Sequence, residues 1–277
     1  MNVKIKALVL GIAIACLSVG AQAWTIHASF DEGEVGAVAD KANDGFHGAG
    51  GQSTYSNEQK LKNNSARISI REGETGYGSW GGEFMFPERV YKGSTIWFLV
   101  HIYMPEDFDH HSYGEGNRLK FLRIQTLSAT GSNHGYNDLY YDQKGAGQPY
   151  KWIYEGESRW VNVGSSENPP QKEAWQSYEM AVTLDNVPVS EGGSAKVRIW
   201  KNGLLLKEIL DRKTLREADD YSNRALLFTY WNGGAPQDQH MYVDEITITV
   251  EEPVNADAHG NPHIGGLLKY RPVMAGD

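Results

Sequence analysis

Residues 226–250 read LLFTYWNGGAPQDQHMYVDEITITV. The first part, 226–231, is aromatic and ends at an Asn-Gly-Gly sequence, which favours a turn with positive φ angles. The second part, 241–250, alternates apolar and polar side chains, as in a strand with one face on a core. We therefore predict two strands of one sheet. The alternation places these residues of the second strand on one side: Tyr242, Asp244, Ile246, Ile248 and Val250.

The predicted sheet keeps one face lined by aromatic and polar groups. This face ends at a loop that contains Asp238, Gln239 and His240. An exposed, aromatic-rich sheet is unusual in a soluble protein, and apolar patches of this kind mark binding sites. Pyranose rings stack well on flat aromatic side chains. The stretch therefore indicates carbohydrate binding.

The composition is that of an acidic, β-rich globular protein. The chain has 277 residues with 31 Gly, 15 Tyr and 8 Trp, which favours strands and turns over helices. This length fits one large β domain or two small ones. A formal net charge of -9 would repel a phosphate backbone, so we expect no nucleic-acid partner. An acidic polysaccharide would be held only where basic residues gather in one groove.

The N-terminal residues 1–23 have the pattern of a bacterial-type signal peptide. Lys4 and Lys6 precede an apolar run, 7–20, and Ala-Gln-Ala closes the segment. We expect a secreted or periplasmic protein without a membrane span, because the apolar run is too short to cross a bilayer comfortably. Cys16, the only cysteine, leaves a lipoprotein anchor as an alternative. The mature chain then has no cysteine and must depend on its core.

About a dozen short strands without intervening helices predict an antiparallel two-sheet β-sandwich, or jelly roll. We expect one domain over residues 24–251, a C-terminal tail over 252–277 packed on or near it, and a monomer. Strand alternation predicts a core between the sheets made of Phe98, Val100, Ile102, Leu122, Ile124, Met180, Val182, Val197, Ile199, Ile246 and Ile248.

Several sequence motifs follow one another in an order that resembles a known family. They are Phe-Asp-x-Gly at 30–33, a Trp-containing strand ending in Tyr-Met-Pro at 103–105, Lys-Phe-Leu-Arg-Ile-Gln at 120–125, Trp-Lys-Asn-Gly at 200–203 and Tyr-Trp-Asn-Gly-Gly at 230–234, with Tyr-Val-Asp-Glu-Ile after it. Together they resemble the concanavalin-like jelly-roll proteins, which include secreted polysaccharide lyases acting on alginate or glucuronan. The resemblance covers about residues 24–251.

The chain also departs from the signatures of this family. The Arg-x-Glu-x-Arg and Gln-Ile-His motifs of well-known alginate lyases are missing, and Arg-Ile-Gln at 123–125 occupies a comparable strand position. The paired-carboxylate Glu-x-Asp-x-x-Glu strand of jelly-roll glucanases is missing as well. The second absence makes a glycoside hydrolase less favoured than a lyase.

The resemblance implies β-elimination from a uronic acid. This reaction needs a group that neutralises the carboxylate, a base for the neighbouring C–H proton and an acid for the leaving oxygen. Related lyases use Arg, Gln, Asn or His for the first role and His, Lys or Tyr for the others. We expect Arg123 and Gln125 as neutralisers, His101 as base and Tyr230 as acid, all on the non-core side of long strands. Lys120 has the other parity and is held in reserve.

Each candidate also has a structural interpretation. Arg123 would then pair with Glu83, and His101 would be a satisfied residue of the sheet. The residues expected to bind substrate are Arg67, Glu83, Trp97, Tyr103, Tyr140 and Trp231. We expect no cofactor for the chemistry, but Asp31 and Asp244, near the first and last strands, are candidates for a structural calcium ion.

Two other classes of function stay open. The same aromatic groove would serve a non-catalytic carbohydrate-binding module, which would lack a proton-transfer set. A glycoside hydrolase would use Glu83 with Glu179 or Glu245, and it requires both carboxylates on one face about 5–10 Å apart.

Overall fold

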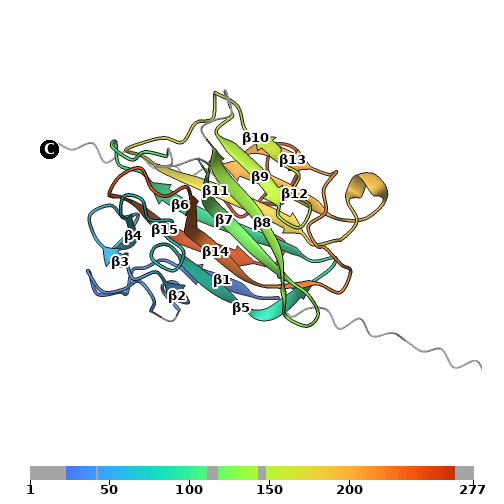
Figure 1. Cartoon of the computed structure of the whole chain (residues 1–277), viewed down its shortest axis with the longest axis horizontal. Coiled ribbons are helices and arrows are strands. Elements are labelled where there is room, and N and C mark those ends of the chain that lie inside the picture. The colour runs from blue at the N-terminus through green and yellow to red at the C-terminus, as the bar shows by residue number, and fades with distance from the viewer. Residues whose placement is uncertain (1–22, 42, 111–117, 143–147, 266–277) are drawn as a thin grey trace, which may run out of the picture.

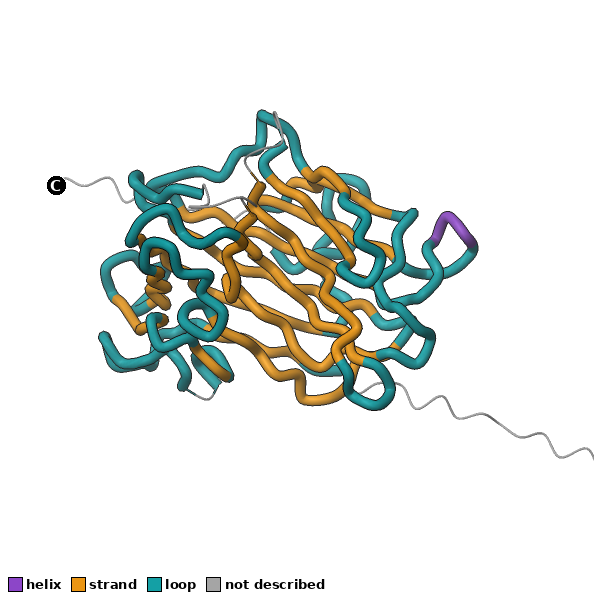
Figure 2. Tube along the Cα trace, in the orientation of Figure 1, coloured by secondary structure: helices purple, strands orange, loops and turns teal. Residues whose placement is uncertain are grey.

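The computed structural model describes residues 23–41, 43–110, 118–142 and 148–265. Within these ranges two antiparallel sheets pack face to face, which confirms the predicted two-sheet β-sandwich. Figure 1 shows the strands crossing the middle of the molecule, and Figure 2 shows the loops gathered around them. No helix in the described part of the chain is long and apolar enough to cross a membrane. The predicted signal peptide falls almost entirely on residues outside these ranges, as does Cys16.

Sheet A contains eight strands. In spatial order they are β13 (Leu204–Ile209), β12 (Lys196–Lys201), β11 (Trp175–Thr183), β6 (Thr95–Tyr103), β15 (Gln239–Thr249), β4 (Ser65–Ile70) and β3 (Ser53–Ser56), and β1 (Thr25–Ala28) pairs with β15.

Sheet B contains seven strands. In spatial order they are β10 (Val161–Val163), β9 (Tyr150–Tyr154), β8 (Asn133–Asp142), β7 (Arg118–Leu127), β14 (Tyr221–Asn232), β5 (Gly82–Tyr91) and β2 (Gly48–Ala49). A short 3₁₀ helix, Val189–Glu191, is the only helical element of the described ranges.

The core between the sheets is apolar and rich in aromatic rings. All eleven residues predicted for it are at most 1% exposed. An aromatic stack that strand alternation does not predict lies at its centre, where Phe121 is 4.7 Å from both Tyr141 and Phe228, measured between ring centroids. Large buried rings remove much apolar area from water, which compensates for the absence of disulfides.

The predicted pairing of the two strands in residues 226–250 is wrong. The first strand belongs to β14 in sheet B, where its neighbours are β7 and β5, and the second is β15 in sheet A. Gly233 and Gly234 have φ angles of 83° and 82°, as the Asn-Gly-Gly sequence predicts. The turn carries the chain across the sandwich instead of closing a hairpin, because both strands already have partners on both sides.

A β-bulge changes which side chains of β15 face the core. The register against β6 shifts between Asp244 and Thr247, and Glu245 has a φ of 45°. Met241 and Val243 therefore face the core before the bulge, as Ile246 and Ile248 do after it. Tyr242 and Asp244 lie on the outer face, in contrast to the strict alternation predicted from the sequence.

Two further register shifts shape sheet B. In β7 the pairing with β8 shifts between Lys120 and Leu122, and in β14 the pairing with β7 shifts between Leu227 and Tyr230. As a result Phe121 is fully buried in the core, although alternation placed it on the opposite face. Lys120 moves to the outer face of the sheet, where Arg123 already lies.

Residues 252–265 of the tail form a strap across the outer face of sheet A. The buried carboxylate of Glu179 accepts the backbone N–H groups of Ile264 at 2.8 Å and Gly265 at 3.0 Å. The indole N–H of Trp200 donates to Asp257 at 2.9 Å. The strap therefore covers the outer face of sheet A near Trp97 and Trp200.

Replacement of Phe121 by alanine tests the register shift in β7. A buried phenylalanine leaves a cavity, so Phe121→Ala should lower the free energy of unfolding by about 3–5 kcal/mol. Leu204→Ala, at a site that is 59% exposed, serves as control and should change it by less than about 0.5 kcal/mol. Denaturant unfolding measures both, and a loss below about 1 kcal/mol for Phe121→Ala would place this ring outside the core.

Candidate functional site

The outer face of sheet B carries a cluster centred on Lys120. In the strand register Lys120 lies opposite Tyr140 of β8 on one side and Tyr230 of β14 on the other. Its ammonium nitrogen lies 5.7 Å from the Tyr140 ring centroid and 5.4 Å from that of Tyr230. Lys120 Nζ also lies 6.0 Å from the ring centroid of Tyr136. One cation is thus surrounded by three phenol rings from two neighbouring strands.

Two carboxylates hold the cations of this cluster. Lys120 Nζ lies 2.6 Å from Glu155 Oε1 and 3.5 Å from Asp138 Oδ2. Arg123 Nε donates to Asp138 Oδ1 at 2.9 Å. The side chains of Asp138 and Arg123 are 0% and 3% exposed, whereas Glu155 is 30% exposed. Burial raises the pKa of Glu155, and the nearby Asp138 charge adds to this effect.

The phenol groups of the cluster differ in accessibility. Tyr140 is 3% exposed, and its hydroxyl donates to Asp138 Oδ2 at 3.1 Å, so it supports the buried carboxylate. Burial raises the pKa of Tyr136, while the Arg123 guanidinium, 3.9 Å from the ring centroid, opposes that rise. Tyr136 and Tyr230 are both partly exposed. They are the hydroxyl groups that a ligand on this face can reach.

The predicted neutralisers Arg123 and Gln125 both lie on this face. Gln125 donates from Nε2 to the Tyr136 hydroxyl at 3.1 Å. Arg123 is paired with Asp138 and not with Glu83, which instead accepts a hydrogen bond from Arg224 at 3.0 Å. The guanidinium therefore contributes charge from beneath the Tyr136 ring rather than from the open surface.

A hollow of about 310 Å³ adjoins the cluster on the β14–β5 side. Tyr77 forms part of its wall and lies 6.2 Å from Tyr230 between ring centroids. Thr229, on the same wall, accepts a hydrogen bond from Arg123 Nη1 at 3.4 Å. The polar cluster therefore opens into a space with aromatic and hydroxyl groups, which suits a sugar residue.

His101 is not part of this cluster. It lies on the outer face of β6 in sheet A, so the whole apolar core separates it from Tyr230 and Arg123. Its side chain is 6% exposed, its Nδ1 lies 3.2 Å from the Glu245 carbonyl oxygen, and burial lowers its pKa. The convergence of all four predicted catalytic residues in one groove is therefore wrong, since strand parity does not specify which sheet a strand joins.

Three of the predicted substrate-binding residues also lie in sheet A. The Trp97 indole donates to the Pro262 carbonyl of the strap at 3.3 Å. Arg67 lies beside His240, with 3.2 Å between Nη2 and Nδ1, and Tyr103 packs against Trp175 at 5.8 Å between centroids. None of these three residues can join a ligand that lies on sheet B.

The other three residues predicted to bind substrate lie in sheet B, but not all on the same face of it. Tyr140 belongs to the cluster, and Glu83 lines the adjoining hollow. Trp231 is 0% exposed and stacks against Trp80 and Phe108 in the core, at 5.8 and 6.1 Å between centroids. Regular alternation from the core residues Ala225 and Leu227 places Trp231 inward and Tyr230 on the outer face.

Sequence reasoning missed Tyr136 and Glu155 and placed Lys120 only in reserve. Tyr136 and Tyr140 lie in a Tyr-x-Asp-x-Tyr sequence, 136–140, whose alternation puts two phenols and a carboxylate on one face. The alternation in residues 136–140 is therefore a sequence signal for this part of the site. Lys120 was hidden by the bulge, which depends on pairing with distant strands. Glu155 follows β9 in a turn and has no periodic signal.

The calcium candidates Asp31 and Asp244 both bind loop backbone. Asp31 Oδ1 accepts the N–H groups of Asn63 and Asn64 at 2.8 and 3.2 Å, and Asp244 Oδ2 accepts that of Leu61 at 2.8 Å. Across the described ranges, no group of three or more His, Cys, Asp or Glu side chains is arranged to hold a metal ion. Calcium takes six to eight oxygen ligands, so two carboxylates are not a sufficient site. Calcium here stays a prediction.

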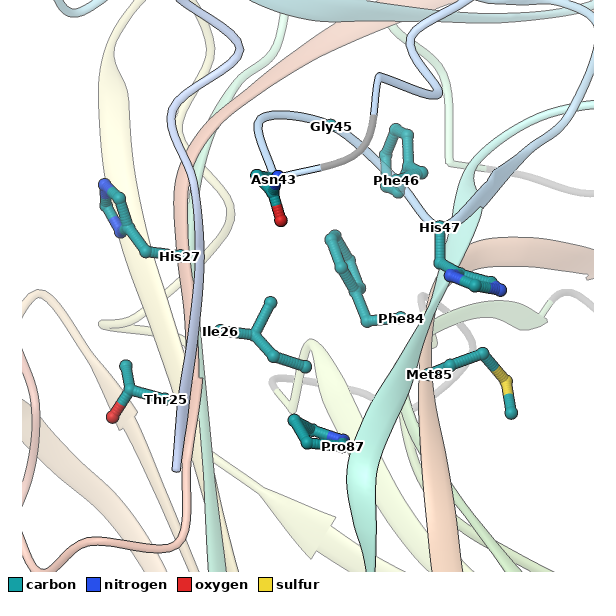
Figure 3. Close-up of a pocket in the computed structure, with 10 residues that line it drawn as sticks. All are labelled: Thr25, Ile26, His27, Asn43, Gly45, Phe46, His47, Phe84, Met85 and Pro87. Atoms are coloured by element: carbon teal, nitrogen blue, oxygen red, sulfur yellow. The ribbon is translucent and has the colours of Figure 1, made fainter. Parts of the chain in front are cut away.

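A separate cavity of about 460 Å³ lies between β1 of sheet A and β5 of sheet B. In Figure 3 Ile26, Asn43 and Phe84 point into it, while His27 and Met85 point away. The inward side chains include no acid–base pair. This cavity is therefore a gap at the side of the sandwich and a weaker candidate than the Lys120 cluster.

Comparisons with known proteins identify the fold. No family model and no curated protein matches the chain. Among solved structures, it is similar to an alginate lyase variant bound to alginate tetrasaccharide (TM-score 0.57, 13% identity, 81% of this chain and 96% of that chain). It is also similar to an alginate lyase from Aplysia kurodai (0.52, 12%, 72% and 87%) and to an endo-β-1,4-glucuronan lyase from Trichoderma reesei (0.51, 12%, 82% and 95%). The chain therefore shares the fold of these polysaccharide lyases, as the sequence resemblance implied.

The buried charges of the cluster yield a stability prediction. Asp138→Ala leaves the Arg123 guanidinium buried without its partner, so we expect a loss of about 3–5 kcal/mol in the free energy of unfolding. Glu32→Ala removes an ion pair with Lys41 in which the glutamate side chain is 72% exposed, and it should cost less than about 1 kcal/mol. Equal losses for the two variants in denaturant unfolding would contradict the described burial of Asp138.

Proposed function

We propose that this protein is a secreted polysaccharide lyase that cleaves a uronic-acid-containing polysaccharide by β-elimination at the Lys120 cluster. The observation that carries the proposal is the direct cross-strand pairing of Lys120 with Tyr230 on the open face of sheet B. The fold shared with alginate and glucuronan lyases supports it. Secretion remains part of the proposal, since it depends on residues 1–23.

The cations of the cluster account for carboxylate neutralisation. Lys120 is the more accessible cation, with a side chain that is 12% exposed against 3% for Arg123. A uronate carboxylate placed beside Lys120 would also feel the charge of Arg123 beneath the Tyr136 ring. Charge-assisted contacts of this kind stabilise the negative charge that moves toward the carboxylate as the neighbouring C–H bond breaks. Gln125 keeps Tyr136 in place through its hydrogen bond.

The two accessible phenols account for proton transfer. In the elimination the base takes the C–H proton, the C–H electron pair forms the new C=C bond, the C–O bond to the next sugar breaks, and the leaving oxygen takes a proton from the acid. Tyr230 is the proposed acid, as the sequence predicted. Tyr136 replaces His101 as the proposed base and acts as a phenolate, which the charge of Arg123 favours against the effect of burial. The rings of both lie within 5.4–6.0 Å of Lys120 Nζ, so one bound sugar could contact both hydroxyl groups.

Two solved structures of a related fold add support by analogy. An alginate lyase was captured with alginate trisaccharide and tetrasaccharide in variants that each lack a lysine, and the tetrasaccharide complex also lacks a tyrosine. Loss of a lysine and a tyrosine in a substrate-bound lyase fits a site in which these two residue types matter.

The hydrolase alternative has little support from the geometry. Glu83 lies in sheet B, whereas Glu179 and Glu245 lie in sheet A, so the carboxylate pairs considered from the sequence do not share a face. Asp138 and Glu155 do lie together, but Asp138 is fully buried and accepts hydrogen bonds from Arg123 and Tyr140. A buried carboxylate cannot act on a substrate, so the pair required for hydrolysis is incomplete.

Formation of an unsaturated sugar tests the proposal. Elimination leaves a conjugated double bond that absorbs in the ultraviolet, so the mature protein is screened against alginate, glucuronan, ulvan, pectate and glycosaminoglycans. With the polymer that reacts, Tyr230→Phe should lower kcat by about 10²–10⁴-fold with little change in folding or binding. Tyr91→Phe is the matched control, because Tyr91 is a 49% exposed tyrosine on the same sheet, paired with Tyr221.

The remaining outcomes separate the alternatives. His101→Gln should leave the rate unchanged, because His101 lies on the other sheet. Binding of an acidic polymer without any absorbing product would favour a carbohydrate-binding module. Full activity of Tyr230→Phe would refute the proposed acid, and product formation that depends on His101 would refute the placement of the site.

A further inference from the structure

Arg118 and Trp160 form a second cation–aromatic pair at one side of the Lys120 cluster. The Arg118 guanidinium carbon lies 4.4 Å from the Trp160 ring centroid. Trp160 is 37% exposed, one of the more exposed large side chains of the described ranges. Tyr140 connects the pair to the cluster, since its ring lies 5.1 Å from Trp160 and 5.7 Å from Lys120 Nζ.

Within the described part of the chain, Arg118 shares with Arg89 the lack of a carboxylate partner, in contrast to most cations of sheet B. Lys120 is paired with Glu155, Arg123 with Asp138, and Arg224 with Glu83. Arg118, in contrast, forms no ion pair with any described residue. Its charge is therefore available to an anionic ligand, whereas the charges of the three paired cations are already largely compensated.

Trp160 also forms part of the wall of a polar cavity of about 480 Å³ between β10 and β13. The same space is lined by Gln148, Asn162, Lys207 and Arg212. The carboxylates of Glu208 and Asp211 also line it, and they pair with Arg198 and Arg212, respectively. Arg212 Nε is buried and has no hydrogen-bond partner among the residues that the structure describes. An indole surface, amide groups and the Arg212 Nε–H group suit a sugar ring with hydroxyl groups.

We propose that Arg118 and Trp160, with the adjoining cavity, form a distal subsite that binds a further uronic acid residue of the polysaccharide held at Lys120. The inference rests on the proposed function, because it places the subsite along the same chain of sugars. Trp160 provides the stacking surface, and Arg118 meets the carboxylate. Tyr140 lies between Trp160 and Lys120. A substrate bound at Lys120 therefore reaches the subsite only if it is long enough to extend past Tyr140.

The length of the substrate and the salt concentration distinguish the stacking role of Trp160 from the charge of Arg118. With the polymer that forms product, Trp160→Ala and Arg118→Ala should each raise KM by about tenfold for the hexasaccharide and the polymer, and kcat should stay unchanged. The shortest oligosaccharide that is cleaved should show no such change, because it does not reach Trp160. The Arg118→Ala effect should shrink as salt screens the charge, while the Trp160→Ala effect should persist.

The control is a similar pair elsewhere on sheet B. The Arg89 guanidinium carbon lies 4.3 Å from the Tyr221 ring centroid, so Arg89→Ala removes the same kind of contact outside the cluster. Arg89→Ala should leave KM unchanged for every substrate length. An equal rise in KM for Arg89→Ala and Arg118→Ala, or a rise that does not depend on substrate length, would overturn the subsite.

Failure of the subsite and failure of the lyase proposal have different signatures. Product formation with an unchanged KM in Trp160→Ala overturns the subsite and leaves the lyase proposal intact. If no polymer forms product, the lyase proposal fails, and calorimetric binding of alginate and glucuronan hexasaccharides decides the subsite. Binding that Trp160→Ala abolishes would support it, and binding that Trp160→Ala does not change, or no binding at all, would overturn it.

Discussion

Asp138 is the buried charge around which the open face of sheet B is organised. Its carboxylate is fully buried. It forms ion pairs with Arg123 at 2.9 Å and Lys120 at 3.5 Å, and it accepts a hydrogen bond from the Tyr140 hydroxyl at 3.1 Å. A buried charge is tolerated only when it is paired and hydrogen-bonded, so these three side chains are held in defined positions. The same contacts fix the cations beside the accessible phenols Tyr136 and Tyr230. The electrostatic requirement of one aspartate thus preorganises the candidate site.

Irregular strand pairing makes this arrangement possible. A regular β7 would place Lys120 and Arg123, three residues apart, on opposite faces, because side chains alternate along a strand. The register shift beside Phe121 turns this ring into the core and brings both cations to the outer face. A corresponding shift in β14 buries Phe228 beside Leu227 and brings Thr229 to the outer side, where it accepts a hydrogen bond from Arg123. Bulges of this kind re-aim side chains, and here two of them meet at the same site.

The two sheets of the sandwich have different outer surfaces. On sheet A the strap over residues 252–265 covers Trp97 and Trp200, and buried Glu179 binds the strap through two backbone amides. On sheet B the Lys120 cluster and the hollow beside Tyr77 remain accessible. This asymmetry explains why the aromatic residues of the two sheets cannot be pooled into one groove.

The sequence by itself determined the fold class and the core. Positions such as Phe98, Val182 and Ile248 follow a period of two, and burial on one face of a strand is encoded locally by that period. It also marked Arg123, Gln125 and Tyr230 as outer-face residues of long strands. Only the tertiary structure decided that β14 and β15 join different sheets and that His101 lies across the core from Tyr230. Strand partners and bulges depend on hydrogen bonds between segments far apart in the chain, so no local pattern specifies them.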